Sequence, residues 1–288
     1  MMIKRNEKQH SRRNFIKNSA VLIGATGAWS QLTYAEDAET KKFLLNRSFK
    51  VGMAGYSFIN FNIDQALAMM KRTDVKFLCI KDFHLPYDST DIQIEEFLTK
   101  LQQAGVTGYA VGPIGDEIDI DRAFDYAHRV GVKLITGIPA LKDLPSINMK
   151  VKQYDICYAI HNHGPDETRY TDATAVYNLI KDLDTRIGLC FDIGHNMRYG
   201  SNPVVDLEKF SHRIFDIHLK NVTAASEEGK ACELGRGVID IPAFIKTLHK
   251  INYSGCCCLE HEKDMTDPLP GIAESLGYFN GVCDGLTI

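Results

Sequence analysis

The chain has 288 residues, 44% of them hydrophobic and 24% charged, with 22 glycines and 9 prolines. This ordinary globular composition excludes a disordered, collagen-like or low-complexity chain. The formal net charge is -4, and residues 1–35 carry six basic residues and one acidic residue, so the remainder carries -9. An acidic body is a poor partner for nucleic acid or anionic lipid. No apolar run reaches the roughly 18 residues of a transmembrane helix.

The first 35 residues have the layout of an export signal. Two adjacent arginines lie in the run Ser11–Lys17, and a mildly apolar stretch follows at Ala20–Trp29. The segment Thr33-Tyr34-Ala35 then offers a cleavage site after Ala35. This order is typical of a signal peptide, and the arginine pair resembles the twin-arginine signal, which a receptor recognises. The alternative is a basic amphipathic helix of the fold. We expect residues 1–35 to be the signal and 36–48 a linker, with export to the periplasm and no stable membrane anchor.

Short apolar runs alternate with amphipathic stretches from Phe49 onward. The runs are rich in Val, Ile, Leu, Cys and Phe, and polar residues or glycine bound them, as is typical of buried strands. They predict strands at Lys50–Tyr56, Lys76–Lys81, Val106–Val111, Lys133–Gly137, Ile156–His161, Ile187–Asp192, Ile214–Lys220 and Gly255–Glu260. Helical spacing predicts helices at Ile63–Lys71, Ile92–Gln103, Ile120–Val130, Asp172–Leu183, Val205–Phe210, Ile241–Ile251 and Leu269–Phe279. Pro139 and Pro145 limit the interval from Ile138 to Asp155 to a short helix.

Eight predicted strands alternate with about eight helices over roughly 240 residues, which favours a (β/α)8 TIM barrel. Continuous apolar strands also fit a parallel sheet that is buried on both faces. A doubly wound open sheet is the competing architecture, and it usually carries a glycine-rich phosphate loop after its first strand. Here Gly52 and Gly55 lie within the first strand and a third glycine is missing. We therefore predict a single α/β domain, a TIM barrel at residues 49–288.

Eight cysteines in an exported protein raise the question of disulfide bonds. Six of them lie inside predicted strands, where a free thiol behaves as a small hydrophobic group. These six are Cys79, Cys157, Cys190, Cys256, Cys257 and Cys258. Cys232 and Cys283 lie in less apolar surroundings and are the candidates for a bridge.

Imidazole, carboxylate and ammonium groups gather at the carboxyl ends of five predicted strands. In chain order they are Lys81 and His84, His161 and His163, Asp192 and His195, His218 and Lys220, and Glu260 and Glu262. A parallel barrel brings these ends to one face, where the active sites of this fold lie. Buried charged groups are costly unless they are paired or bind metal. Nitrogen and oxygen ligands without thiolate suit Zn²⁺, Mn²⁺, Co²⁺ or Fe²⁺.

Taken in order, these strand ends resemble those of the xylose-isomerase-like barrels of the sugar phosphate isomerase/epimerase family, over roughly Lys50 to Phe279. The likeness includes Asn162-His163, Asp192-x-x-His195 and the run Gly235–Asp240 before a late helix. The resemblance implies a small-molecule carbohydrate substrate and one divalent metal (Mn²⁺, Zn²⁺ or Co²⁺). Carried over position by position, the metal ligands are His161, Asp192, His218 and Glu260.

One position departs from the family pattern. His161 stands where the epimerases carry a glutamate, and in that resemblance two metal-bound glutamates share proton abstraction and return across an enediolate. Only Glu260 remains here. A second base must then come from among Glu167, Glu262, His163, His84 and Lys81. A lyase or hydratase needs one base and one acid, and so becomes the main alternative.

The resulting hypothesis is an exported, metal-dependent sugar isomerase or epimerase that acts on an unphosphorylated ketose or keto-sugar. Glu260, His195 and His163 are predicted to be catalytic. The residues predicted to contact the substrate are Lys81, His84, Glu167, Lys220 and Glu262. A β-eliminating lyase on a keto-glycoside is the first alternative, and a non-catalytic carbohydrate-binding barrel is the second. A homo-oligomer is compatible with the sequence.

Overall fold

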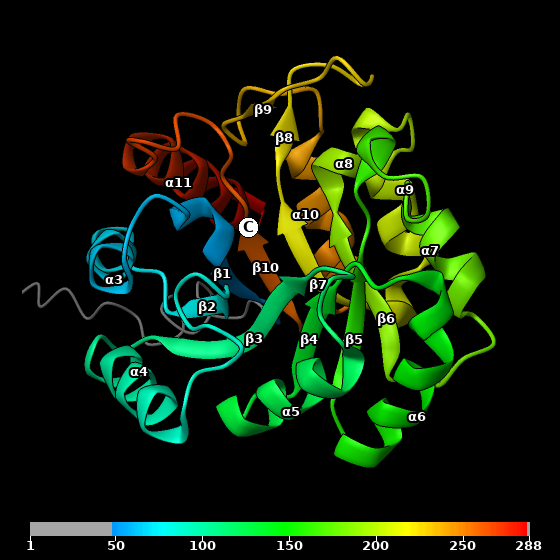
Figure 1. Cartoon of the computed structure of the whole chain (residues 1–288). Coiled ribbons are helices and arrows are strands. Elements are labelled where there is room, and N and C mark those ends of the chain that lie inside the picture. Colours follow the sequence, from blue (N-terminus) through cyan, green and yellow to red (C-terminus); the bar gives the residue numbers. More distant parts are fainter. Residues whose placement is uncertain (1–47, 287–288) are drawn as a thin grey trace, which may run out of the picture. The chain divides into compact units, whose positions relative to one another are not determined.

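The computed structural model describes residues 48–286, so the predicted signal peptide and nearly all of the predicted linker lie outside it. The described chain forms a closed barrel of eight parallel strands (Figure 1), which confirms the predicted TIM barrel. The strands are β1 (Lys50–Ala54), β2 (Phe77–Ile80), β3 (Thr107–Ile114), β4 (Leu134–Gly137), β5 (Cys157–His161), β6 (Ile187–Asp192), β7 (Ile214–Leu219) and β10 (Cys256–Leu259). Pairing of β1 with β10 closes the sheet.

Helices connect the strands and cover the outside of the barrel (Figure 1). They are α3 (Ile63–Arg72), α4 (Asp91–Gln103), α5 (Ile120–Val130), α6 (Leu144–Tyr154), α7 (Ala173–Ile180), α8 (Ile193–Arg198), α9 (Pro203–Lys209), α10 (Ile241–Lys250) and α11 (Leu269–Leu286). Capping boxes start α3 at Asn62 and α4 at Thr90, because each side chain accepts a hydrogen bond from an otherwise unpaired N–H group. Within residues 48–286, no helix has the length and apolarity needed to span a bilayer.

Several elements differ from the prediction. The helix between Ile138 and Asp155 was predicted to be short, but α6 has 11 residues. Pro145 does not shorten it, because it lies in the first turn of α6, where proline is tolerated. Helix α8 escaped prediction because it is short and directly follows β6. An antiparallel pair, β8 (Asn221–Val222) and β9 (Ala231–Cys232), extends beyond β7. This pair was not predicted, because a strand of two residues is too short to show the alternation of polar and apolar residues that marks a strand.

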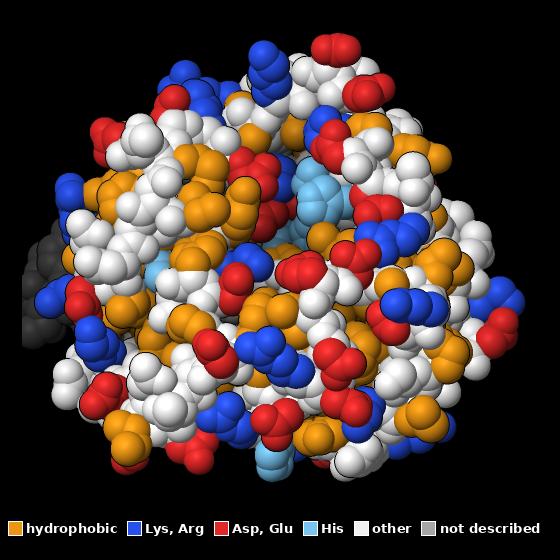
Figure 2. All heavy atoms as spheres, in the orientation of Figure 1, with side chains coloured by type: hydrophobic (Ala, Val, Ile, Leu, Met, Phe, Trp, Pro, Cys, Tyr) orange, Lys and Arg blue, Asp and Glu red, His pale blue; other side chains and the backbone are white. Residues whose placement is uncertain are grey.

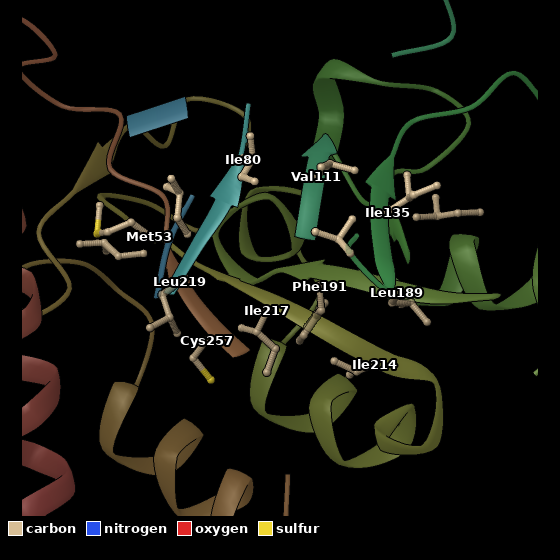
Figure 3. Packing of buried hydrophobic residues seen from close by; sticks show 14 of the residues in the cluster. Met53, Ile80, Val111, Ile135, Leu189, Phe191, Ile214, Ile217, Leu219 and Cys257 are labelled. Atoms are coloured by element: carbon tan, nitrogen blue, oxygen red, sulfur yellow. The ribbon is translucent and has the colours of Figure 1, made fainter. Parts of the chain in front are cut away.

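The buried hydrophobic residues form two cores. The larger core lies between the barrel and its helices and contains Phe191, Ile217 and Cys257 (Figure 3). A smaller core, inside the barrel, contains Ala54, Cys79, Ala110, Cys256 and Cys258. Neighbouring residues of a strand face opposite sides, which explains why Cys257 is separated from the cysteines on either side. No disulfide bond joins the cysteines of residues 48–286, so the Cys232–Cys283 bridge is absent.

The packing of the larger core, called here the outer core, can be tested at Ile217, which is fully buried. Ile217→Val should lower the free energy of unfolding by about 1 kcal/mol, because it removes one buried methyl group and leaves a small cavity. Urea unfolding followed by circular dichroism measures the change. Val205→Ala, at a side chain that is 59% exposed, is the control and should have almost no effect. Equal losses in the two variants would contradict this packing.

Candidate active site

A cavity of about 280 Å³ lies at the mouth of the barrel, among the carboxyl ends of the strands. Figure 2 shows a hollow in this face, in which histidine side chains lie beside acidic ones. The cavity is lined by Tyr56, Lys81, Pro113, Gly115, Glu117, Ile138, His161, His163, His195, Glu260 and Glu262. Six of the residues predicted from strand ends therefore lie on its wall. A cavity of this size suits a small molecule rather than a polymer.

Four side chains converge at the floor of this cavity and are called here the metal-binding group. His161 ends β5, Asp192 ends β6, His218 lies in β7 and Glu260 directly follows β10. Each offers one donor atom, and the four atoms lie within 4.8 Å of one another. His161 Nε2 lies 3.1 Å from His218 Nδ1 and 3.6 Å from Asp192 Oδ2. His218 Nδ1 lies 3.2 Å from Glu260 Oε2. The four residues predicted as metal ligands thus form one compact group.

The backbone around Asp192 holds this group in place. The Asn162 side chain donates to the Asp192 carbonyl and accepts from the Asp192 N–H, both at 2.9 Å. These two bonds tie the ends of β5 and β6 together. Asp192 also caps α8, because its Oδ1 accepts the N–H of His195 at 2.7 Å. Its second oxygen, Oδ2, remains directed at the other three side chains.

The donor chemistry of the four residues fits a divalent cation. His161 Nδ1, Asp192 Oδ2 and His218 Nε2 are buried and have no hydrogen bond of good geometry. Leaving such atoms unsatisfied costs about 1–3 kcal/mol each, and a cation in the middle of the group would satisfy Asp192 Oδ2. Two imidazoles and two carboxylates form a ligand set that Zn²⁺, Mn²⁺ and Co²⁺ all accept. The residues present therefore fit the predicted metal.

Lys220 is a buried cation beside the same carboxylates. Its Nζ lies 3.2 Å from Asp192, 2.9 Å from Glu260 and 2.9 Å from Glu262. Burial alone would lower the pKa of Lys220, but these carboxylates raise it well above its usual value. Lys220 in turn lowers the pKa of Asp192 and of Glu260, against the effect of burial. With all three carboxylates ionised, one ammonium leaves two negative charges, which a divalent cation would neutralise.

The remaining residues on the cavity wall surround this floor. The rings of His163 and His195 lie with their centroids 4.6 Å apart. Burial lowers the pKa of both histidines, and the positive charge of Lys220 adds to the effect. Lys81 donates to the Pro113 carbonyl at 2.7 Å. Glu262 is partly exposed, and burial raises its pKa. The wall thus carries both proton acceptors and proton donors.

Two residues predicted to contact the substrate lie elsewhere. The ring of His84 lies 3.0 Å from the Phe61 carbonyl, and His84 lines a separate surface pocket with residues of α3 and α4. Glu167 pairs with Arg169 at 2.6 Å and is not among the residues that line the mouth cavity. Both follow strand ends in the sequence, but the loops that carry them turn away from the cavity.

The Glu167–Arg169 pair should make stability depend on pH. Hydrogen bonds from Arg169 lower the pKa of Glu167 from 4.5 to about 2. A depressed carboxyl pKa contributes stability above pH 4.5 and loses it as the pH falls toward 2. Glu167→Gln should therefore cost about 1 kcal/mol at pH 7 and almost nothing at pH 2. Thermal melts of both proteins across this range test the prediction, and a pH-independent difference would contradict it.

Sequence reasoning missed five residues of the cavity wall, and two of these, Tyr56 and Glu117, carry polar side chains. Tyr56 lies two residues after β1, in the short 3-10 helix Gly55–Phe58, so the strand-end argument could have included it. Glu117 belongs to the loop between β3 and α5. That loop has no periodic pattern, so no sequence signal marked Glu117.

The chain is similar to several known proteins in sequence and in fold. An inosose dehydratase of Clostridium botulinum is 26% identical over 273 residues, which cover 89% of this chain and 83% of that protein. An inosose dehydratase of Clostridium beijerinckii is 29% identical over 133 residues, and the match spans only 43% of that protein's length. A putative uncharacterised protein of Parabacteroides distasonis has a crystal structure with a TM-score of 0.63 and 26% identity, covering 80% of this chain and 98% of that one.

A more distant structure shows the fold alone. It is described as an IOLI protein with a binding zinc atom, and it superposes with a TM-score of 0.68 at 16% identity, covering 82% of this chain and 99% of that chain. The family model described as xylose isomerase-like TIM barrel matches residues 54–281. This match extends over more than half of the sequence and includes all four residues of the metal-binding group. The chain therefore belongs to the xylose isomerase-like TIM barrel family.

Proposed function

We propose that this protein is a divalent-metal-dependent lyase that eliminates water from an unphosphorylated keto-sugar or keto-cyclitol. The observation that carries the proposal is the composition of the cavity floor. His161 fills the place where a second metal-binding glutamate would serve a two-base epimerase, and proton donors lie close to the remaining carboxylates. The relatives named inosose dehydratase, which is a lyase activity, support the same outcome. This choice reverses the order of the two activities that the sequence favoured.

The metal would be held by His161, Asp192, His218 and Glu260, and when bound it would polarise a substrate carbonyl and acidify the adjacent C–H bond. The zinc atom of the distant IOLI structure supports a metal in this fold. Glu262 lines the cavity beside this group and is placed to remove the acidified proton as a general base. The Lys220 ammonium, 2.9 Å away, holds the Glu262 carboxylate in position.

Elimination also requires an acid. The C–H electron pair forms the new double bond, and the hydroxyl on the next carbon leaves with the electrons of its C–O bond. That hydroxyl takes up a proton and departs as water. His163 and His195 line the cavity. Because their lowered pKa keeps the imidazoles neutral, they are placed to pass a proton to the hydroxyl from one ring nitrogen while the other nitrogen accepts the proton that Glu262 has removed. The proton that Glu262 removes and the proton that histidine donates then balance over one turnover.

Epimerisation or isomerisation is the second candidate function. Glu260 and Glu262 both line the cavity, and Lys220 Nζ lies 2.9 Å from each. Two carboxylates on one cavity wall could remove and return a proton without the loss of a hydroxyl. The two candidates share proton abstraction as their first step, and they differ in whether a hydroxyl then leaves or the proton returns.

Incubation of the metal-loaded protein with a panel of keto-sugars and inososes in D₂O separates the candidates. A lyase yields a product lighter by one water, whereas an epimerase yields a sugar of unchanged formula that has gained deuterium. Mass spectrometry distinguishes these products directly. A protein that binds metal and sugar but yields neither product would be a carbohydrate-binding barrel, and both catalytic proposals would fail.

We further propose that the protein works after export to the periplasm, on the evidence of the arginine pair and the apolar stretch before Ala35. The export proposal predicts a mature protein that begins after Ala35. Intact-mass measurement on protein from the periplasmic fraction of the native host tests this prediction. A full-length chain that remains in the cytoplasm would contradict it.

A further inference from the structure

A second group of metal-ligating side chains lies inside the barrel, on the amino-terminal side of the metal-binding group at the mouth. Asp216, Cys256 and Cys258 are buried there, and their donor atoms lie within 4.8 Å of one another. We propose that these three residues and Tyr109 form a second metal site, which binds a thiophilic cation of the Zn²⁺ class. The metal-binding group at the mouth uses none of these four residues.

The spacing of the donor atoms suits tetrahedral zinc. Zn–S bonds of about 2.3 Å place two sulfur ligands of a tetrahedral site about 3.8 Å apart. Cys256 Sγ and Cys258 Sγ are 3.8 Å apart. They lie two residues apart on β10, so both point into the barrel. The two sulfurs are therefore already separated as a bound zinc ion would require.

Two oxygen donors complete the set. The Tyr109 hydroxyl lies 2.7 Å from Cys258 Sγ and donates to Asp216 at 2.9–3.0 Å. Asp216 is the register neighbour of Cys256 in the pairing of β7 with β10. Two sulfurs from β10, one carboxylate from β7 and one hydroxyl from β3 thus converge from three strands. Cysteine sulfur and carboxylate oxygen are ligands that Zn²⁺ accepts, and the Tyr109 hydroxyl lies beside them as a further oxygen.

Gly52 on β1 lies directly beside the two sulfurs. Gly52 pairs with Cys258 in the register of β1 with β10. A Cβ atom at Gly52 would lie 2.8 Å from Cys256 Sγ and 2.9 Å from Cys258 Sγ. TIM barrels usually fill their interior with bulky branched residues, whereas the neighbours here include Ala54 and Ala110. The absence of a side chain at Gly52 therefore lets the two sulfurs lie directly against β1.

A pocket at the other end of the barrel reaches one residue of this site, Tyr109. Tyr109 lines a pocket of about 410 Å³ together with Lys133, Leu134, Phe215 and Gly255. These residues lie at or next to the amino-terminal ends of β4, β7 and β10. An ion could therefore approach past the Tyr109 ring without crossing the cavity at the mouth. Zn²⁺ would replace the two thiol protons, which would pass to the solvent.

Anaerobic titration of the full chain with Co²⁺ tests the proposal, because cobalt reports thiolate ligation through an intense near-ultraviolet charge-transfer band. The wild-type protein should bind two equivalents, one of which produces the band. The double variant Cys256→Ser/Cys258→Ser should lose the band and one equivalent. Cys257→Ser is the matched control, because Cys257 lies on the same strand but in the outer core, and it should keep both.

Two further variants assign the sites. Asp192→Asn/Glu260→Gln should keep the thiolate band and lose the other equivalent, so a failure of the metal site at the mouth would remain distinguishable. Tyr109→Phe should keep the band and weaken cobalt binding by about tenfold or more. A wild-type protein without a thiolate band would overturn the proposal, even if the serine variants failed to fold. A band that survives in the double serine variant would also overturn it.

Discussion

Replacing Glu262 with glutamine is expected to lower kcat by about a thousandfold and to leave divalent-metal binding intact. Glu262 lines the cavity beside the metal-binding group without belonging to it. Glutamine keeps the shape of the side chain but cannot take a proton from carbon. Steady-state kinetics on the identified substrate and metal analysis of the purified variant measure the two effects separately.

Glu260→Gln is the variant with which Glu262→Gln should be compared. Glu260 belongs to the metal-binding group, so its replacement should reduce both metal content and turnover. Glu274→Gln is the negative control, because Glu274 pairs with Arg236 at the surface. If Glu262→Gln retained wild-type turnover, Glu262 would not be the base. If it lost the metal, Glu262 would act on the metal site instead.

Lys220→Met is expected to destabilise the metal-free protein by about 3–5 kcal/mol, the usual cost of removing one partner from a buried ion pair. Lys220 is 3% exposed and lies within 3.2 Å of Asp192, Glu260 and Glu262. Methionine fills a similar volume but leaves these carboxylates without their ammonium. Denaturant unfolding after chelation measures the loss.

The same variant should bind a divalent cation about tenfold more tightly or better, because it removes a positive charge next to the metal-binding carboxylates. Added metal should therefore recover part of the lost stability, since a ligand of the folded state stabilises it. Lys263→Met removes a half-exposed lysine that pairs with Glu233 and serves as the control. A metal affinity unchanged by Lys220→Met would show that the ammonium and the metal do not share these carboxylates.

The strands were the most predictable part of this protein. Each barrel strand falls within one or two residues of an apolar run, except that β3 continues to Ile114. A strand that is buried on both faces must be apolar along its length, and that requirement is visible in the sequence. The metal-binding group was predictable from two arguments together. Parallel strands place the polar residues at their ends side by side, and the resemblance to the xylose-isomerase-like barrels selected the four ligands among them.

The loops were not predictable in the same way. His84 and Glu167 follow strands as His163 does, yet only His163 reaches the cavity. The path of a loop depends on partners that are distant in sequence, such as Phe61 for His84. The same holds for Lys220. Its position at the end of β7 could be predicted from the sequence, but its burial among three carboxylates could not.

The sequence by itself determined the barrel, the order of its strands and the identity of the residues at their ends, because burial and strand period act on each segment locally. Only the tertiary structure decided which side chains meet beyond the four predicted metal ligands. It placed Lys220 against the metal-binding carboxylates, and it placed Cys256 and Cys258 with Asp216 inside the barrel while Cys257 packs outside. Contacts between strands depend on the register and closure of the whole sheet, which no single segment encodes.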